Sequence, residues 1–132
     1  MMVTFAGKAD PSKRKYILYN GKEILCIDYA NMDEQTCVDQ IAYNNACLPE
    51  EIAAGKRDLL QFVDITGTFG TPKVIDALKN AAALMKPHTK KTAVVGVAGI
   101  KKVLMNAVNM FSGLGAKAFD TEQEAKDWLV QD

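Results

Sequence analysis

The sequence contains no long apolar run, and this absence limits where the protein can reside. No segment of the 132 residues approaches the roughly 20 consecutive apolar residues that a membrane-spanning helix needs. Residues 1–8 also lack the sustained apolar stretch of a secretory signal. We therefore expect a cytoplasmic protein that does not insert into a membrane.

Net charge is also absent. The 16 basic side chains are balanced by 16 acidic ones, whereas proteins that hold nucleic acid electrostatically carry a clear basic excess. Aromatic residues make up 8% of the chain and are scattered, which does not suit a platform for stacking bases. We expect no nucleic-acid partner.

The residues that most often carry catalysis or bind metals are scarce. His88 is the only histidine, and a zinc site needs three or four ligands. The three cysteines show no CxxC spacing and are interpreted as structural thiols. Ser12 and Ser112, the two serines, do not lie in a nucleophile-elbow motif. We predict no metal, no cofactor and no enzymatic activity.

The chain does contain a regular alternation of strand and helix patterns. Residues 1–14 are polar and are interpreted as an N-terminal arm, and residues 15–132 are interpreted as a single domain. The chain is 48% apolar, which is enough for a hydrophobic core. The expected elements, in chain order, are strands at 16–19 and 22–29, a helix at 32–47 ending near Pro49, a strand at 59–65, a helix from Thr71, a strand at 92–97, a helix at 100–111, a strand at 116–119 and a helix from Thr121.

Local signals set the ends of these elements. Asn20-Gly21 suits the tight turn of a hairpin. The residues interpreted as N-caps, with the neighbour that supports each, are Asn31 with Glu34, Thr71 with Pro72 and Thr121 with Glu124. Strands that alternate with helices favour parallel crossovers. We expect an α/β fold with a mixed, mostly parallel sheet of about five strands, an N-terminal β-hairpin and four helices.

Two loops are expected at the carboxyl ends of neighbouring parallel strands, where ligands bind in open α/β sheets. One follows the strand at 59–65, and the other follows the strand at 92–97. Bare glycine amides, threonine hydroxyls, helix N-termini and a lysine suit a phosphate or another small anion. The candidate phosphoacceptor or anion-binding residues are Thr66, Thr68, Thr71, Gly96, Gly99 and Lys101.

Two questions about this edge stay open. Thr71 is either an N-cap only, with the glycines merely turning the chain, or also a phosphate site next to Lys101 or Lys102. Asp64 either accepts a hydrogen bond from Thr66 or binds magnesium, and the hydrogen bond is the preferred interpretation.

The predicted helix at 100–111 offers a further candidate surface, away from its apolar stripe. Methionines among lysines and asparagines can form an adaptable contact face. We interpret it as the face for a protein partner or a homodimer, with incidental exposure, or burial under the N-terminal arm, as the alternative. Its residues are Lys102, Met105, Asn106, Asn109 and Met110.

Two segments of the chain, Lys90–Val97 and Phe119–Leu129, form recognisable motifs. The second combines Phe-Asp, several acidic residues, an alanine and Trp-Leu. Together with the order of elements from Tyr16 onward, these segments resemble the STAS/SpoIIAA-like domains of sulfate-transporter tails and anti-sigma-factor antagonists. The closer likeness is to stand-alone bacterial STAS/SEC14-like proteins. The resemblance implies a SpoIIAA-like fold.

The resemblance also implies a function. In anti-sigma-factor antagonists, a serine or threonine that caps the helix after the third strand is phosphorylated by a partner kinase. Thr71 matches that position, within Phe69-Gly70-Thr71-Pro72 in place of an Asp-Ser-Ser-Gly type of sequence. This implies a bacterial, non-enzymatic regulatory or protein–protein interaction module that is phospho-modulated at Thr71. The SEC14-like kinship implies the alternative, a protein that binds a lipid or a phosphorylated metabolite.

Overall fold

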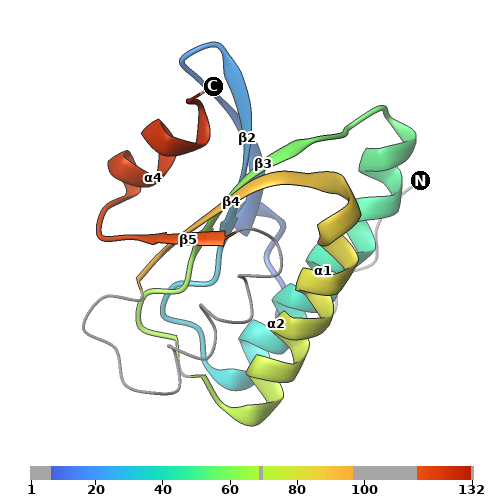
Figure 1. Cartoon of the computed structure of the whole chain (residues 1–132). Coiled ribbons are helices and arrows are strands. Elements are labelled where there is room, and N and C mark those ends of the chain that lie inside the picture. Colours follow the sequence, from blue (N-terminus) through green and yellow to red (C-terminus); the bar gives the residue numbers. More distant parts are fainter. Residues whose placement is uncertain (1–6, 69, 97–115, 132) are drawn as a thin grey trace.

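A five-stranded mixed sheet forms the centre of the molecule in the computed structural model, which describes residues 7–68, 70–96 and 116–131 (Figure 1). The strands follow one another across the sheet in chain order. The first two pair antiparallel, and all later pairs are parallel. Their bounds are β1 Arg14–Tyr19, β2 Lys22–Asp28, β3 Leu59–Asp64, β4 Thr89–Val95 and β5 Ala116–Phe119. The predicted sheet is confirmed.

Helices cover both faces of the sheet. α1 (Glu34–Ala53) and α2 (Pro72–Met85) pack together on one face, and α4 (Glu122–Leu129) lies on the other (Figure 1). Short 3₁₀ turns occur at η1 (Pro11–Lys13) and η2 (Lys86–His88). The described part of the chain holds three α-helices where four were predicted, because the helix expected at 100–111 lies outside the described residues. No helix in the described ranges is long and apolar enough to cross a membrane.

The hairpin between β1 and β2 turns at Asn20-Gly21, as predicted. Both residues have left-handed backbone angles, with φ values of 48° and 81°. A two-residue turn of this kind matches the twist of antiparallel strands, and asparagine and glycine tolerate its positive φ values best. The turn fixes the register in which Tyr19 lies opposite Lys22.

The start of α1 differs from the prediction. Asp33, and not Asn31, is the N-cap, because its Oδ1 accepts the N–H of Thr36 at 2.7 Å. Asn31 has a left-handed backbone, with a φ of 56°, and donates its N–H to the carbonyl of Thr66 at 2.7 Å. The predicted capping box of Asn31 with Glu34 is therefore wrong, because a tertiary contact holds Asn31 outside the helix.

The end of α1 also differs, since the helix continues through Pro49 to Ala53. A proline inside a helix removes one hydrogen bond and crowds the preceding turn. The ring of Pro49 is exposed, while Leu48 before it is buried and Ile52 after it packs against the same core. Burial of these neighbours offsets the cost of the proline, so the predicted stop near Pro49 is wrong.

Two hydrophobic clusters join the helices to the sheet. The cluster on the side of α1 and α2 includes Leu25, Ile27, Ile41, Val63, Leu78 and Val94. The cluster on the side of α4 consists of Ile24, Phe62, Ala93, Val95, Ala125 and Leu129. β4 contributes to both clusters, as predicted for a central strand that is apolar on both faces.

Residues 7–13, which belong to the predicted N-terminal arm, contact α1. The N–H of Asp10 donates to Oε1 of the buried Gln40 at 2.8 Å, and Gln40 in turn donates to Asn44 at 3.3 Å. The last residue of the predicted arm, Arg14, already belongs to β1. The division into an arm and one domain stays a prediction.

A buried ion pair links the first strand to the end of α1. The side chain of Arg14 is 4% exposed, and that of Glu51 is 18% exposed. Nε of Arg14 donates to Oε2 of Glu51 at 3.1 Å, and a terminal guanidinium nitrogen donates to Oε1. Burial alone would lower the pKa of Arg14, but the hydrogen bonds and the charge of Glu51 outweigh it and raise that pKa. The pair therefore holds a charged guanidinium inside the fold.

Removing one partner of this pair should destabilise the fold strongly. Glu51→Gln leaves the buried guanidinium without a counter-charge, and we expect the free energy of unfolding in urea titrations to fall by about 3 kcal/mol. Lys13→Met is the control, because it breaks a half-exposed pair with Asp28 at 3.4 Å and should cost less than about 1 kcal/mol. Equal losses in the two variants would contradict the importance of the buried pair.

Candidate functional site

The loops that follow β3 and β4 meet at the carboxyl edge of the sheet. Asp64 lies opposite Val95 in the register of the two strands, and the N–H of Ile65 donates to the carbonyl of Val95 at 3.1 Å. Thr66 then lies directly against Gly96. The predicted convergence of the two loops is confirmed for these described residues.

Gly96 is required at this junction for two reasons. Its φ of 92° lies in a region that residues with side chains rarely adopt. A Cβ atom at this position would also lie 2.4 Å from the backbone nitrogen of Thr66 and 2.5 Å from its Oγ1. Gly96 thus lets the two loops touch, which supports the interpretation in which this glycine shapes the chain.

Asp64 fixes the first residues of the loop after β3. Its Oδ1 accepts the N–H of Thr66 at 2.9 Å and the hydroxyl of Thr66 at 2.7 Å. The preferred interpretation of Asp64, a hydrogen bond from Thr66, is confirmed. Thr66 itself is exposed, so its hydroxyl lies at the surface of the edge.

Thr68 has a different role from the one proposed for it. Its side chain is buried, its hydroxyl donates to the carbonyl of Tyr29, and the same oxygen accepts the N–H of Met32 at 3.4 Å. Thr68 therefore ties the loop after β3 to the chain between β2 and α1. A hydroxyl buried and paired in this way is not available to a kinase or an anion. Thr68 is therefore not a phosphoacceptor or an anion-binding residue.

Thr71 is the N-cap of α2, as predicted. Its backbone is extended, and its Oγ1 accepts the N–H of Val74 at 3.3 Å. Pro72, which has no N–H, occupies the first turn. The side chain of Thr71 is partly exposed. The residue thus stands at the start of the helix that follows the third strand.

An open hollow of about 520 Å³ lies at this edge, and its described lining is acidic. The lining consists of Asp64, Thr66, Gly67, Val95, Gly96, Asp120 and Glu122. The described lining contributes three carboxylates and no basic side chain, which is the opposite of what an anion site needs. Among the described residues, no three metal-binding side chains come together to hold an ion. An anion here would depend on cations from elsewhere, such as Lys101.

Sequence reasoning missed the acidic side chains Asp120 and Glu122. They follow β5, whose carboxyl end reaches the same edge because the strand runs parallel to β4. The argument that placed the loops after β3 and β4 at this edge applies equally to the residues after β5. Strand direction alone could therefore have found them.

The three cysteines have properties that agree with the predicted structural role. All three are free thiols. Burial raises the pKa of Cys26 and of Cys47, and it raises the pKa of Cys37 to about 11. A thiol with a raised pKa stays protonated at neutral pH and is a weak nucleophile.

The other predicted site residues all fall outside the described part of the chain. They are Gly99, Lys101, Lys102, Met105, Asn106, Asn109 and Met110. Their proposed roles in anion binding and partner contact stay predictions.

The family of the chain follows from comparison with known proteins. A family model described as SpoIIAA-like matches residues 27–130. The chain belongs to the SpoIIAA-like family. Searches of curated proteins and of solved structures found no match. The segment that matches the SpoIIAA-like family includes the whole described carboxyl edge, with Thr71 and the acidic residues after β5, and the resemblance drawn from the sequence is confirmed.

Replacing Gly96 tests the contact on which this edge is built. Gly96→Ala adds both left-handed strain and a clash with Thr66, whereas Gly21→Ala adds strain alone, since nothing lies within 4 Å of its Cβ position. We expect Gly21→Ala to cost about 1–2 kcal/mol of unfolding free energy. Gly96→Ala should cost about 1–3 kcal/mol more. The same loss at both positions in urea titrations would show that the two loops are not in close contact.

Proposed function

We propose that this SpoIIAA-like domain is a non-enzymatic regulatory module that binds a protein partner, or a second copy of itself, at the carboxyl edge of its sheet. Phosphorylation of Thr71 modulates that binding. The observation that supports this proposal is the position of Thr71 as N-cap of the helix after the third strand. In the anti-sigma-factor antagonists that the chain resembles, the phosphorylated residue occupies that position.

The surroundings of Thr71 suit a phosphate. Thr71 is partly exposed, and the one hydrogen bond of its hydroxyl oxygen among the described residues, from the N–H of Val74, is long at 3.3 Å. A phosphate on this oxygen can accept the N–H groups of Lys73 and Val74, and the N-terminal end of a helix favours negative charge. Phosphorylation is therefore expected to stabilise the start of α2.

The modification would act mainly through electrostatics at the surface. It adds close to two negative charges to an edge whose described hollow already carries three carboxylates. A partner with acidic side chains would then be repelled, and like charges placed against each other cost several kcal/mol. The state of Thr71 thus changes which partner surface fits, while the fold stays the same.

The alternative, a carrier of a lipid or a phosphorylated metabolite, receives little support from the described core. The cavity lined by Tyr29, Gln61, Val63 and side chains of α2 has a volume of about 20 Å³. This volume holds about one water molecule, whereas ligand pockets measure about 300–1,000 Å³.

Phosphorylation can be tested by incubating the purified protein with radiolabelled ATP and a lysate of the source cells. We expect label on the wild type and on Thr71→Ser, which keeps both hydroxyl and cap, and none on Thr71→Ala. Thr66→Ala removes the exposed hydroxyl on the same edge and should be labelled like the wild type. Thr71→Ala loses a cap worth about 1 kcal/mol, so circular dichroism should confirm that it is folded. Label that persists on Thr71→Ala would contradict the proposal.

The effect on partner binding can be measured with Thr71→Asp, which keeps the cap and adds negative charge. Asn80→Asp is the matched control, because it adds the same charge at an exposed position farther along α2, away from the carboxyl edge. In quantitative affinity capture, we expect a partner that binds the wild type and Asn80→Asp equally and binds Thr71→Asp about tenfold less. Indistinguishable capture by all three proteins would argue against a regulatory role for Thr71.

A further inference from the structure

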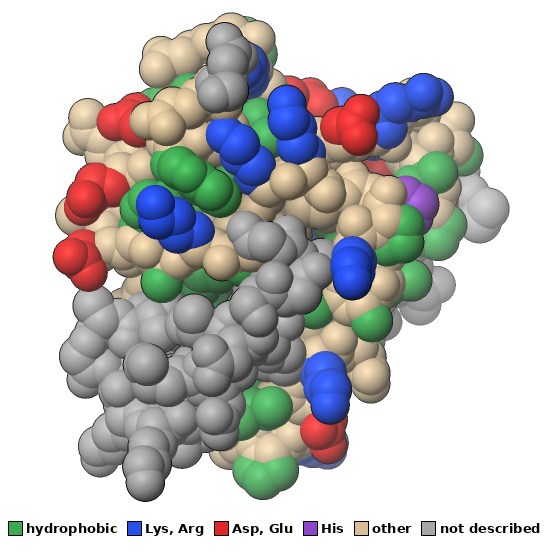
Figure 2. Space-filling model, viewed as in Figure 1, with side chains coloured by type: hydrophobic (Ala, Val, Ile, Leu, Met, Phe, Trp, Pro, Cys, Tyr) green, Lys and Arg blue, Asp and Glu red, His purple; other side chains and the backbone are tan. Residues whose placement is uncertain are grey.

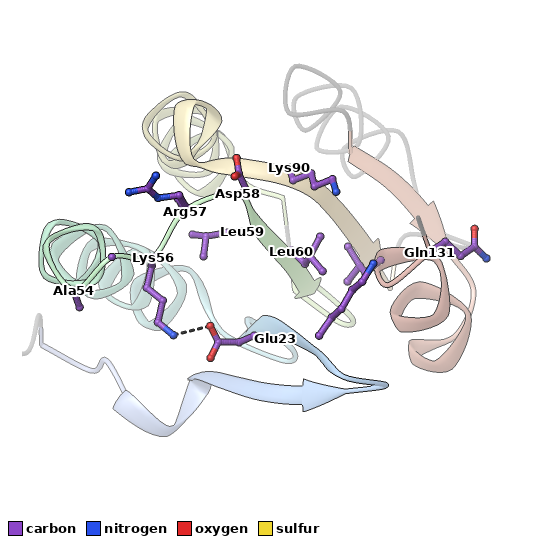
Figure 3. Close-up of a pocket in the computed structure, with 12 residues that line it drawn as sticks. Glu23, Ala54, Lys56, Arg57, Asp58, Leu59, Leu60, Lys90 and Gln131 are labelled. Atoms are coloured by element: carbon purple, nitrogen blue, oxygen red, sulfur yellow. Dashed lines mark hydrogen bonds and ion pairs between the residues drawn. The ribbon is translucent and has the colours of Figure 1, made fainter.

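A second groove crosses the opposite, amino edge of the sheet (Figure 3). It is open and has a volume of about 530 Å³. The loop between α1 and β3, the hairpin, the start of β4 and the residues at the end of α4 all contribute to its lining. Lys56 from the loop reaches Glu23 on β2, and the two side chains bridge one wall of the groove (Figure 3).

The groove is basic, although the chain as a whole is neutral. Its charged lining residues are Lys22, Lys56, Arg57 and Lys90, with the acidic Glu23 and Asp58. Nζ of Lys56 lies 2.6 Å from Oε1 of Glu23, so these two charges neutralise each other. Arg57 and Lys90 are exposed, and neither forms an ion pair with another described residue. These two cations can therefore meet a partner without first breaking a contact.

Leucine side chains form the apolar part of the lining. Leu59 and Leu129 are buried, and Leu60 is partly exposed. Leu18, which is 78% exposed, pairs in register with the groove residue Glu23. An exposed apolar side chain thus stands beside a groove that already combines leucines with cations.

The basic surface continues from the groove to Trp128. Nζ of Lys91 lies 5.0 Å from the centre of the Trp128 ring and donates to the carbonyls of Trp128 at 3.0 Å and of Gln131 at 2.7 Å. Gln131 lines the groove, and Nζ of Lys117 lies 5.9 Å from the same ring. Lysine and arginine side chains gather around hydrophobic ones on the upper part of this face (Figure 2).

We propose that this amino-edge groove binds an acidic peptide segment of a protein partner, with an apolar residue of the peptide placed against the leucines. One carboxylate of the peptide can form a bidentate pair with the guanidinium of Arg57, and a second carboxylate can pair with the ammonium of Lys90. The carboxylate of Asp58, which follows Arg57 in the lining, disfavours a uniform polyanion such as a nucleic-acid backbone, because it repels closely spaced phosphates. The groove lies at the other end of the strands from Thr71, so its role goes beyond the function proposed above.

A short synthetic peptide that alternates Glu with Leu and Phe, and contains no tryptophan, is the probe. Trp128 is the only tryptophan of the chain, so its fluorescence reports binding next to the groove. We expect the acidic peptide to bind, and the matched peptide with Gln in place of Glu to bind at least about tenfold more weakly. Added salt should weaken the binding, because it screens exposed charges.

Paired variants locate the binding. Arg57→Ala combined with Lys90→Ala should weaken binding of the acidic peptide by about tenfold. Lys73→Ala combined with Lys79→Ala removes the same net charge from exposed positions on α2 and should bind like the wild type. All four side chains are exposed, so thermal unfolding of both double variants should match that of the wild type.

Several results would overturn this proposal. If the two double variants weakened peptide binding equally, the binding would depend on the net charge of the protein and not on the groove. Equal affinity for the Gln peptide would remove the role of carboxylates, and tighter binding to phosphatidylserine vesicles or single-stranded RNA would assign the groove to another class of partner. Thr71→Asp should leave the peptide affinity unchanged. That variant separates a failure of this proposal from a failure of regulation at Thr71.

Discussion

The direct contact between the chain after β3 and the chain after β4 is the constraint on which the carboxyl edge depends. Gly96 provides the space in which the backbone of Thr66 lies. The carbonyl of Thr66 in turn holds Asn31, and the hydroxyl of Thr68 holds the carbonyl of Tyr29. The segments that follow β2, β3 and β4 are thus held together at a single edge of the sheet, the edge at which Thr71 begins α2.

Much of the fold could be predicted because local chemistry and tertiary packing favour the same structure at most positions. Asn20-Gly21 has the backbone preferences that its turn requires, and the apolar run of β4 is buried on both faces. The errors arose where tertiary contacts decided between local signals or overrode one of them. Asn31 and Asp33 are both good capping residues, and only the contact with the loop after β3 decides between them. Pro49 is a strong stop signal that the packing of Leu48 and Ile52 against the core overrides.

The candidate site was predictable in place but not in detail. Strand direction brings Thr66, Thr68 and Thr71 to one edge, yet the same residue type takes different roles there. Thr66 is exposed, Thr68 is buried under a neighbouring loop, and Thr71 caps a helix. Burial depends on segments distant in sequence, so composition could not separate these roles. The amino-edge groove was missed for a related reason, since its cations come from separate segments of a chain whose total charge is zero.

The neutral composition conceals a separation of charge along the strands. β4 runs from the basic groove to the acidic hollow and has 7 residues, which at about 3.3 Å per residue separates the two ends by about 20 Å. The Debye length at physiological ionic strength is about 8 Å, so exposed charges at one end hardly affect binding at the other. A phosphate on Thr71 would therefore alter the carboxyl edge without altering the groove. Electrostatics alone gives the two ends independent binding, and coupling between them would require a movement of the helices that connect them.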